Sequence, residues 1–107
     1  MVMEAPTQRP DTLRWLMEWY EGHCDGDWEH GFGPEISTVD NPGWRLKVPL
    51  EGTKCDGREF PRLDHNLDHE TEWWTCWTEN NEFHGAGGPL QLAAMIETFR
   101  AWTEAIA

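Results

Sequence analysis

Residues 24–33 read CDGDWEHGFG and bring a thiol, three carboxylates and an imidazole into seven consecutive positions. Side chains of these types bind metal ions, act as thiolate nucleophiles and transfer protons. The segment is therefore a candidate for three kinds of chemistry: a metal site, a reactive cysteine, or a pair of catalytic acids.

The metal hypothesis depends on whether enough ligands converge. Asp25, Asp27 and Glu29 alternate, so an extended backbone would direct all three carboxylates to one side. An EF-hand calcium loop beginning at Asp25 would need glycine at its sixth position and glutamate at its twelfth, but the chain has histidine and isoleucine there. A zinc site would need two ligands besides Cys24 and His30, and no cysteine pair has the short spacing typical of zinc sites. The sequence thus predicts no metal site and no bound cofactor.

The thiol hypothesis concerns Cys24, which lies just beyond a predicted helix. A cysteine nucleophile needs a lowered pKa, which a helix N-terminus or a basic neighbour provides. Cys24 instead follows the negative C-terminal end of the helix dipole and precedes Asp25 and Asp27. These surroundings disfavour a thiolate, so the sequence predicts that Cys24 is a small buried apolar residue.

Paired carboxylates beside tryptophan are also the groups that cleave sugars in glycosidases. A domain of this size, however, has few residues with which to surround a deep substrate cleft. We therefore predict no catalytic residues and expect that the protein is not an enzyme. A small metal- or thiol-dependent enzyme centred on residues 24–30 is the alternative.

Length and charge narrow the classes of partner. The chain has 107 residues, which is the size of one domain. It carries 20 Asp and Glu residues against 8 Lys and Arg, a formal net charge of −12. Nucleic acids and anionic membranes bind basic surfaces, so neither is an expected partner. The charge favours a basic protein partner, whose association it would accelerate.

The cysteines and the apolar runs indicate the compartment. Three cysteines at irregular spacing do not form the even set of a disulfide framework. The N-terminal residues contain no signal-peptide pattern, and no apolar run approaches the roughly 20 residues that span a bilayer. These features predict a cytoplasmic protein.

The first element is predicted to be a helix. Residues 1–10 are interpreted as a flexible lead-in, Asp11 as the N-cap and Gly22 as the C-terminal stop. The helical spacing between them predicts a core-facing stripe with a tryptophan on each flank. The stripe is Leu13, Leu16, Met17 and Tyr20, and the flanking residues are Trp15 and Trp19.

A β-hairpin is predicted next. A strand is expected from Pro34, and DNPG at residues 40–43 is a turn sequence. Residues 44–50 then alternate apolar and basic side chains, as a second strand does. Pro49 marks a strand end or a sheet edge, because proline cannot donate to a ladder.

Two further strands are predicted before the last helix. Residues 58–63 are interpreted as a short strand broken by Pro61, and residues 64–70 as a polar loop. Residues 72–80 carry large side chains on both faces, which indicates a strand inside the sheet.

An amphipathic helix is predicted at the C-terminus. GAGG at residues 85–88 is interpreted as a strand-to-helix connection, and Pro89 as the first helical residue. Helical spacing predicts an apolar face and a polar face. The apolar face contains Leu92, Ile96 and Phe99, and the polar face contains Glu97, Arg100 and Glu104.

This order of elements is typical of an α+β domain. We predict one domain at residues 11–107, with an antiparallel sheet and with the N-terminal and C-terminal helices packed on one face of it. No internal repeat or low-complexity tract interrupts it.

Residues 19–44 resemble the signature of the immunity protein 53 family. The family pattern has Trp-Tyr, then Cys-Asp-Gly-Asp-Trp-Glu-His, a glycine, Ile-x-Thr and Asp-Asn-Pro-Gly-Trp. It is matched here by Trp19, Tyr20, residues 24–30, Gly33, Ile36, Thr38 and residues 40–44. The closing segment is similar to the family's glycine-rich stretch and final helix through Gly85, Gly87, Gly88, Pro89, Ile96, Phe99 and Trp102.

The resemblance implies a bacterial polymorphic-toxin system, in which such a protein binds and neutralises a cognate toxin domain. It carries over no catalytic residues. Together with the acidic charge, it implies a basic toxin such as a nuclease.

Two sets of residues in the signature are predicted to have different roles. The structural set is Cys24, Gly26, Trp28, Asp40, Asn41, Pro42, Gly43 and Trp44, of which the two tryptophans enter the core. Gly26 and Gly31 are expected to adopt backbone angles that favour glycine. Asp25 and Asp40 are expected to accept backbone hydrogen bonds, with His30 in the same network. The candidate toxin-binding set is Asp25, Asp27, Glu29 and His30.

Overall fold

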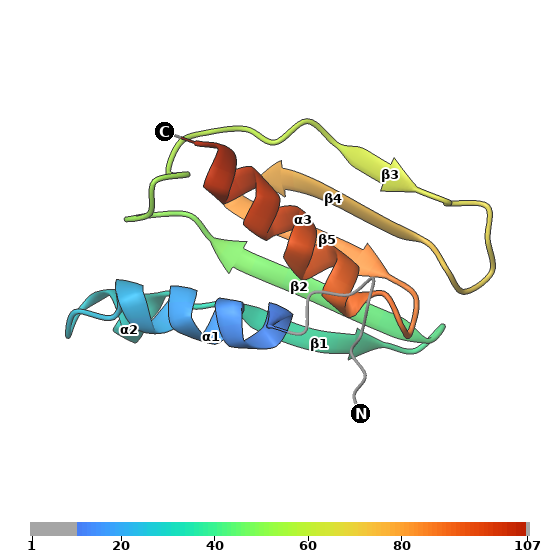
Figure 1. Ribbon diagram of the computed structural model, residues 1–107, viewed down its shortest axis with the longest axis horizontal. Coiled ribbons are helices and arrows are strands. Elements are labelled where there is room, and N and C mark those ends of the chain that lie inside the picture. Colours follow the sequence, from blue (N-terminus) through green and yellow to red (C-terminus); the bar gives the residue numbers. More distant parts are fainter. Residues whose placement is uncertain (1–10, 107) are drawn as a thin grey trace, which may run out of the picture.

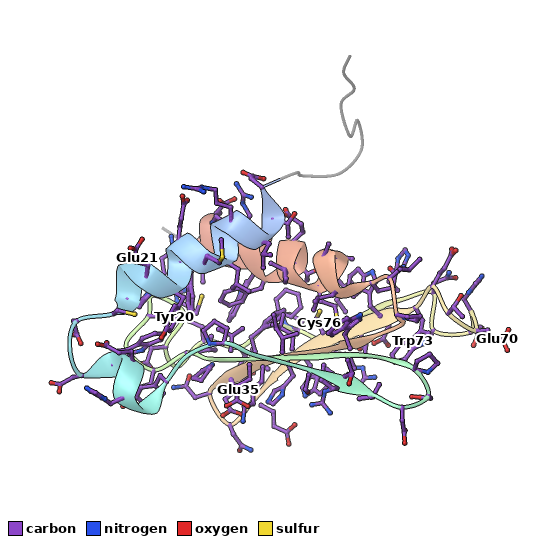
Figure 2. All side chains as sticks on the ribbon, turned by 90° about the horizontal axis from the view of Figure 1, so that it is seen from below. Tyr20, Glu21, Glu35, Glu70, Trp73 and Cys76 are labelled. Carbon is purple, nitrogen blue, oxygen red and sulfur yellow. The ribbon has the colours of Figure 1, made fainter. Side chains whose placement is uncertain are left out.

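The computed structural model describes residues 11–106, and the lead-in predicted at 1–10 lies outside the described residues. A five-stranded antiparallel sheet carries two long helices (Figure 1). The elements are α1 (Thr12–His23), α2 (Trp28–Gly31), β1 (Glu35–Val39), β2 (Gly43–Pro49), β3 (Leu63–His65), β4 (Trp74–Glu79), β5 (Glu82–Gly87) and α3 (Leu92–Ala105). Figure 2 shows α1 and α3 on the same side of the sheet, which confirms the predicted α+β class. None of the helices in the described part is long and apolar enough to cross a membrane.

Two hairpins, β1-β2 and β4-β5, lie side by side in the sheet, and β3 adds a fifth strand beside β4, so the strand order is β1-β2-β5-β4-β3. The predicted hairpin of β1 and β2 is confirmed, with Ile36 opposite Leu46. Asn80 and Asn81, with φ values of 55° and 59°, join β4 to β5 in the left-handed conformation that the tightest hairpin turns require. β2 and β5 pair with each other, so strands that are distant in the sequence form the middle of the sheet.

The core lies between α3 and the central strands. α3 packs on β2, β4 and β5 and buries Met95, Ile96 and Phe99. The rings of Phe99 and Phe83 meet at 5.0 Å between centroids. Burying one side chain of this size contributes about 1.5–3 kcal/mol, so this set fixes the position of α3. The sheet side of the core is Leu46, Val48, Leu50, Cys76 and Phe83.

The glycine-rich segment that was predicted to be a connection is instead part of the central strand β5. Gly85 faces α3, and a Cβ placed on it would lie 2.9 Å from the Sδ of Met95. A Cβ on Gly87 would lie 2.9 Å from the Cβ of Trp74. Close packing on this strand is the physical reason for its glycines, and the prediction from composition alone was wrong.

α3 was predicted to begin at Pro89, but it begins at Leu92. The Gly88 N–H donates to the Trp73 carbonyl at 2.9 Å, and the Pro89 carbonyl accepts a hydrogen bond from Nε1 of Trp44 at 2.9 Å. These bonds hold the backbone against the sheet, so the helix starts only after this turn.

The apolar stripe predicted for α1 is only partly buried. Leu16 is its one buried member, whereas the predicted flanking residues Trp15 and Trp19 pack against the core. The ring of Trp19 lies 5.2 Å from that of Phe99. α1 packs mainly on α3 and not on the sheet, so its buried face is turned toward α3. The other members, Leu13, Met17 and Tyr20, are 59, 52 and 39 % exposed.

Polar contacts also attach α1 to α3. Arg100, predicted to face outward, has a side chain only 12 % exposed, and its guanidinium lies 3.3 Å from the Asp11 carboxylate and 5.5 Å from the centre of the Trp15 ring. The hydroxyl of Thr12 donates to Glu97 at 2.7 Å. Asp11 precedes the helix as predicted, but its side chain makes no capping hydrogen bond because it faces Arg100.

The strand predicted at residues 58–63 is wrong. β3 covers Leu63–His65, so only Leu63 of the predicted strand belongs to it and its other two residues were predicted to be loop. β3 pairs with β4, which lies inside the sheet as predicted. Phe60 packs against the core, and its N–H donates to the Thr78 hydroxyl at 2.9 Å. Pro61 has no N–H for a ladder, so the chain joins the sheet only after it.

Candidate functional site

The loop after α1 is closed by two of its own carboxylates. The carboxylate of Asp25 accepts the N–H groups of Asp27 and Trp28, both at 2.9 Å. The carboxylate of Glu29 accepts the N–H groups of Asp25 and Gly26, also at 2.9 Å. This reciprocal pair satisfies the amide of Trp28, the first residue of α2, which has no helical acceptor, and three amides of the loop that precedes it. The predicted structural role of Asp25 is confirmed, and Glu29 shares it.

Backbone amides hold both of these carboxyl groups in the ionised form. The N–H groups of Trp28 and Asp27 lower the pKa of Asp25. The pKa of Glu29 is lowered first by its own backbone amide and then by those of Asp25 and Gly26. Hydrogen bonds to a charged carboxylate favour the charged form, so the loop keeps both negative charges at neutral pH.

Trp28 anchors the loop to the rest of the domain. Its ring is buried, as predicted, and its Nε1 donates to the Glu51 carbonyl at 2.8 Å. Gly26 has a φ of 99°, as expected for a position that favours glycine. Gly31, for which the same was expected, lies within the short helix α2 and has no such angle. The rings around Trp28 are Trp19, Tyr20, His23 and Phe32, with centroids 5.3 to 6.1 Å away.

Cys24 is the C-cap residue that follows α1, and its side chain is half-buried. The prediction that Cys24 is a buried apolar residue was therefore wrong. Its Sγ donates to the Tyr20 carbonyl at 3.3 Å, because the last turn of a helix leaves carbonyls without partners. The buried cysteines are Cys55 and Cys76. Burial raises the pKa of the Cys76 thiol to about 12 and raises that of Cys55 above its usual range.

The DNPG turn is held by its glycine and by the tryptophan that follows. A Cβ on Gly43 would collide with the carbonyl oxygen of Gly87, so only glycine fits where β2 begins. Trp44 packs against the core, as predicted, and is held by its bond to Pro89. Asp40, expected to accept a backbone amide, is exposed and forms no such bond within the described residues. Asn41 and Pro42 are also exposed.

The four candidate toxin-binding residues lie in this one loop but differ in what holds them. Asp25 and Glu29 use their carboxylates to close the loop. Asp27 and His30 are exposed, and their side chains make no hydrogen bond within the part of the chain that is described. The expected place of His30 in the loop network is therefore not found there.

Histidine rings in the sheet stack on tryptophan. His84 lies 5.3 Å from Trp77, and His65 lies 5.2 Å from Trp74, both in stacked geometry. Among residues 11–106, no three His, Cys, Asp or Glu side chains are grouped as ligands of one metal ion would be.

A groove of about 510 Å³ lies beside the loop, between α1 and β1. We call it the α1/β1 groove. Its apolar lining is Leu13, Leu16, Met17, Tyr20, Phe32, Pro34, Ile36 and Pro49. Gly33, with a φ of 154°, allows the Tyr20 ring to lie close, because a Cβ there would be 3.2 Å from Tyr20 Cε1. Figure 2 shows Tyr20 between α1 and the α2–β1 segment. Residues of α1, the α2–β1 segment, β1 and the end of β2 thus form one concave surface.

Negative charge is concentrated in the same part of the molecule. Residues 11–35 contain seven Asp and Glu residues but only one Lys or Arg, Arg14, which is paired with Glu18 at 3.0 Å. Two of the seven, Asp11 and Glu35, pair with cations of other elements, Arg100 at 3.3 Å and Lys47 at 3.7 Å. Glu29 belongs to the wall of the groove itself, whereas Glu35 lines it but directs its carboxylate to Lys47, 3.7 Å away on the other face of the sheet. The pKa of Tyr20 is raised, first by Cys24 and to a smaller extent by burial and by Glu29.

The groove was missed in the sequence because its residues were assigned to the core. Leu13, Met17 and Tyr20 follow the expected helical spacing, and that spacing does not say which neighbour covers them. A usable signal was the number of apolar residues on α1. Leu16 and the tryptophans at 15 and 19 already fill one face, so the remaining apolar residues exceed what a single buried stripe needs.

Comparison with known families gives one result for this chain. A family model described as Immunity protein 53 matches residues 13–104. The match spans the loop closed by Asp25 and Glu29, the whole sheet and nearly all of α3. Searches of curated proteins and of solved structures gave no match.

Proposed function

The chain belongs to the immunity protein 53 family, and from that premise we propose that it binds a cognate toxin domain directly and neutralises it in the cytoplasm. Family membership supports an immunity function. The direct contact, the acidic surface that makes it and the compartment are our proposal. Neutralisation by binding requires no turnover, so we assign no catalytic residue.

The observation that carries the proposal is the charge of residues 11–35. Seven acidic residues against Arg14 account for half of the formal net charge of −12. Potentials of one sign steer partners of the opposite sign and raise their association rates. A toxin with a basic surface fits this region, and nucleases have such surfaces because they bind phosphates.

We assign different roles to the candidate residues. Asp25 and Glu29 shape the loop, and their ionised carboxylates add to its potential. Asp27 is exposed and is not used by the loop, so its carboxylate is free to meet a lysine or arginine of the toxin. We therefore expect Asp27 to affect binding without affecting the fold.

The test is co-expression with the toxin domain encoded beside this gene, followed by purification and measurement of association rates. The expected result is rescued growth and a complex that purifies intact. The association rate should fall steeply as salt rises, because salt screens charges beyond about 10 Å at 0.1 M.

A matched pair of substitutions tests the acidic surface. Asp27→Asn should slow association several-fold, whereas Glu70→Gln removes one negative charge from the exposed loop at the other end of the molecule and should have little effect (Figure 2). Equal effects from both would assign the rate to net charge and not to this surface. Failure of the wild-type chain to rescue growth or bind any neighbouring toxin domain would overturn the proposed function.

A further inference from the structure

Resting on the proposed function, we propose that the α1/β1 groove is the anchor site for the toxin. It receives apolar side chains from a toxin segment, and Lys or Arg residues flanking them contact the acidic residues around the groove. The acidic surface then sets the rate of encounter, and the groove sets the lifetime of the complex.

The first support is that solvent-exposed apolar side chains gather in the groove. Seven large apolar side chains are exposed among the described residues: Leu13, Met17, Tyr20, Ile36, Leu63, Leu67 and Leu90. Four of the seven line the α1/β1 groove. Single exposed leucines are ordinary on protein surfaces, but a contiguous apolar patch marks a site of interaction.

The second support is that the groove is already formed. Its volume, about 510 Å³, holds several side chains. One wall is the helix α1 and the other is the strand β1, so backbone hydrogen bonds fix both. Gly33 leaves room for the Tyr20 ring beside them, because a Cβ at this position would lie 3.2 Å from Cε1 of the ring. A preformed site loses little conformational entropy on binding, which favours affinity.

Charge identifies the chemistry of the occupant. Glu29 lies in the groove wall and Asp27 is exposed on the adjoining loop, whereas the Glu35 carboxylate pairs with Lys47 on the face of the sheet away from α1 (Figure 2). A second copy of this chain would bring the same acidic residues to the groove, and like charges at an interface cost free energy. A basic segment is instead attracted electrostatically to these carboxylates as it approaches the groove. An apolar centre with a charged rim is also the usual composition of a specific interface.

The experiment measures binding of the same toxin domain to a groove variant. Leu13→Gln with Met17→Gln keeps helix propensity and side-chain size but makes the groove polar, and both side chains are more than half exposed. We expect an increase of about 30-fold or more in Kd, since loss of a central apolar anchor has the size of a hot-spot effect. The change should appear in the dissociation rate, with the salt dependence of association retained.

The matched control is Leu90→Gln, which changes an 88 % exposed leucine in the turn before α3, outside the groove. It should change Kd less than twofold. Both proteins should unfold at the same urea concentration as wild type, because none of the substituted residues is buried.

The outcomes separate the two proposals. Tight binding by wild type and equally tight binding by the groove variant would overturn the anchor site and leave the proposed function standing. No binding by wild type would overturn both. A wild-type chain that sediments as a dimer, and a groove variant that sediments as a monomer, would assign the groove to a second copy and overturn the proposal. It would also be overturned if Val2→Gln with Met3→Gln lowered stability only when the groove is intact, because the chain's own N-terminus would then be the occupant.

Discussion

α1 and α3 are amphipathic helices on the same face of one sheet, but the core uses them differently. α3 lies over the central strands and buries Met95, Ile96 and Phe99, with Leu92 and Trp102 partly buried against the same core. α1 lies beside α3, toward the edge strand β1, and leaves Leu13, Met17 and Tyr20 in contact with solvent.

The difference shows that the apolar residues of this chain serve two purposes. Those of α3 and the central strands pack in the hydrophobic core and stabilise the fold. Those that α1 carries beyond its contact with α3 form a surface that the fold does not need. We therefore expect substitutions on the α3 side to reduce stability and substitutions in the α1/β1 groove to leave stability unchanged.

The largest expected contrast is between Phe99→Ala and Met17→Ala. Phe99 is fully buried, and removing its ring should lower the free energy of unfolding by about 3–5 kcal/mol. Met17 is 52 % exposed, so its truncation should change stability by about 0.5 kcal/mol or less. Urea titrations of the two proteins measure both values. Similar losses from the two variants would contradict the division of the molecule.

The next contrast uses one glycine from each region. A Cβ on Gly88, in the turn before α3, would collide with the Thr71 carbonyl oxygen, so Gly88→Ala should cost about 1–3 kcal/mol as the backbone shifts. Gly22 lies in α1 with nothing within 4 Å of a Cβ. Gly22→Ala should therefore stabilise the protein by about 0.5–1 kcal/mol through helix propensity. Thermal unfolding of the two variants measures both changes in stability. A Gly22→Ala variant less stable than wild type would show that α1 is more tightly packed than described.

Trp28→Phe sharpens the comparison, because Trp28 is the buried residue of the loop that borders the groove. The variant loses the 2.8 Å hydrogen bond to Glu51 and leaves that carbonyl with one acceptor site unfilled. We expect a loss of about 1–2 kcal/mol, smaller than for Phe99→Ala. Hydrogen exchange should localise the loss to residues 24–33. A loss spread evenly over the sheet would place Trp28 in the main core instead.

The smallest expected effect is produced by pH. The pKa values of Asp25 and Glu29 are lowered in the folded loop, so the stability that their hydrogen bonds provide is present above the pKa values of the unfolded chain. It is lost as the pH falls through the lowered values. Amide resonances of Gly26 and Trp28 should therefore shift below about pH 4, the ordinary range of these carboxyl groups. The amide of Phe83 should not follow them, and a common transition at all three would indicate global unfolding.

Local signals predicted most of the elements. The DNPG turn and the alternation in residues 44–50 predicted the first hairpin, and helical spacing predicted both long helices. The reciprocal bonds of Asp25 and Glu29 follow from the spacing of two acids around a helix start, although only the role of Asp25 was predicted.

Features set by tertiary contacts were not predictable in the same way. Glycines in β5 look like a flexible connection until the closeness of Met95 is known. The exposed face of α1 depends on α3 occupying the middle of the sheet, and no local pattern encodes that choice. For the candidate site, the sequence therefore indicated the loop but not the neighbouring groove. The binding roles of Asp27 and His30 remain predictions.

The pairing of β2 with β5 has a consequence for the order of assembly. Each hairpin closes through a short turn, but joining them brings Pro49 opposite Glu82 across the long intervening segment. Closing a long loop costs conformational entropy before the contacts form. The pairing of β2 with β5 is therefore expected to limit the folding rate. Substitutions at Val48 and Phe83 should then slow refolding, whereas changes in the exposed edge strand β1 should mainly speed unfolding. Stopped-flow refolding of such variants would locate the nucleus at the junction of the hairpins, away from the surface proposed to meet the toxin.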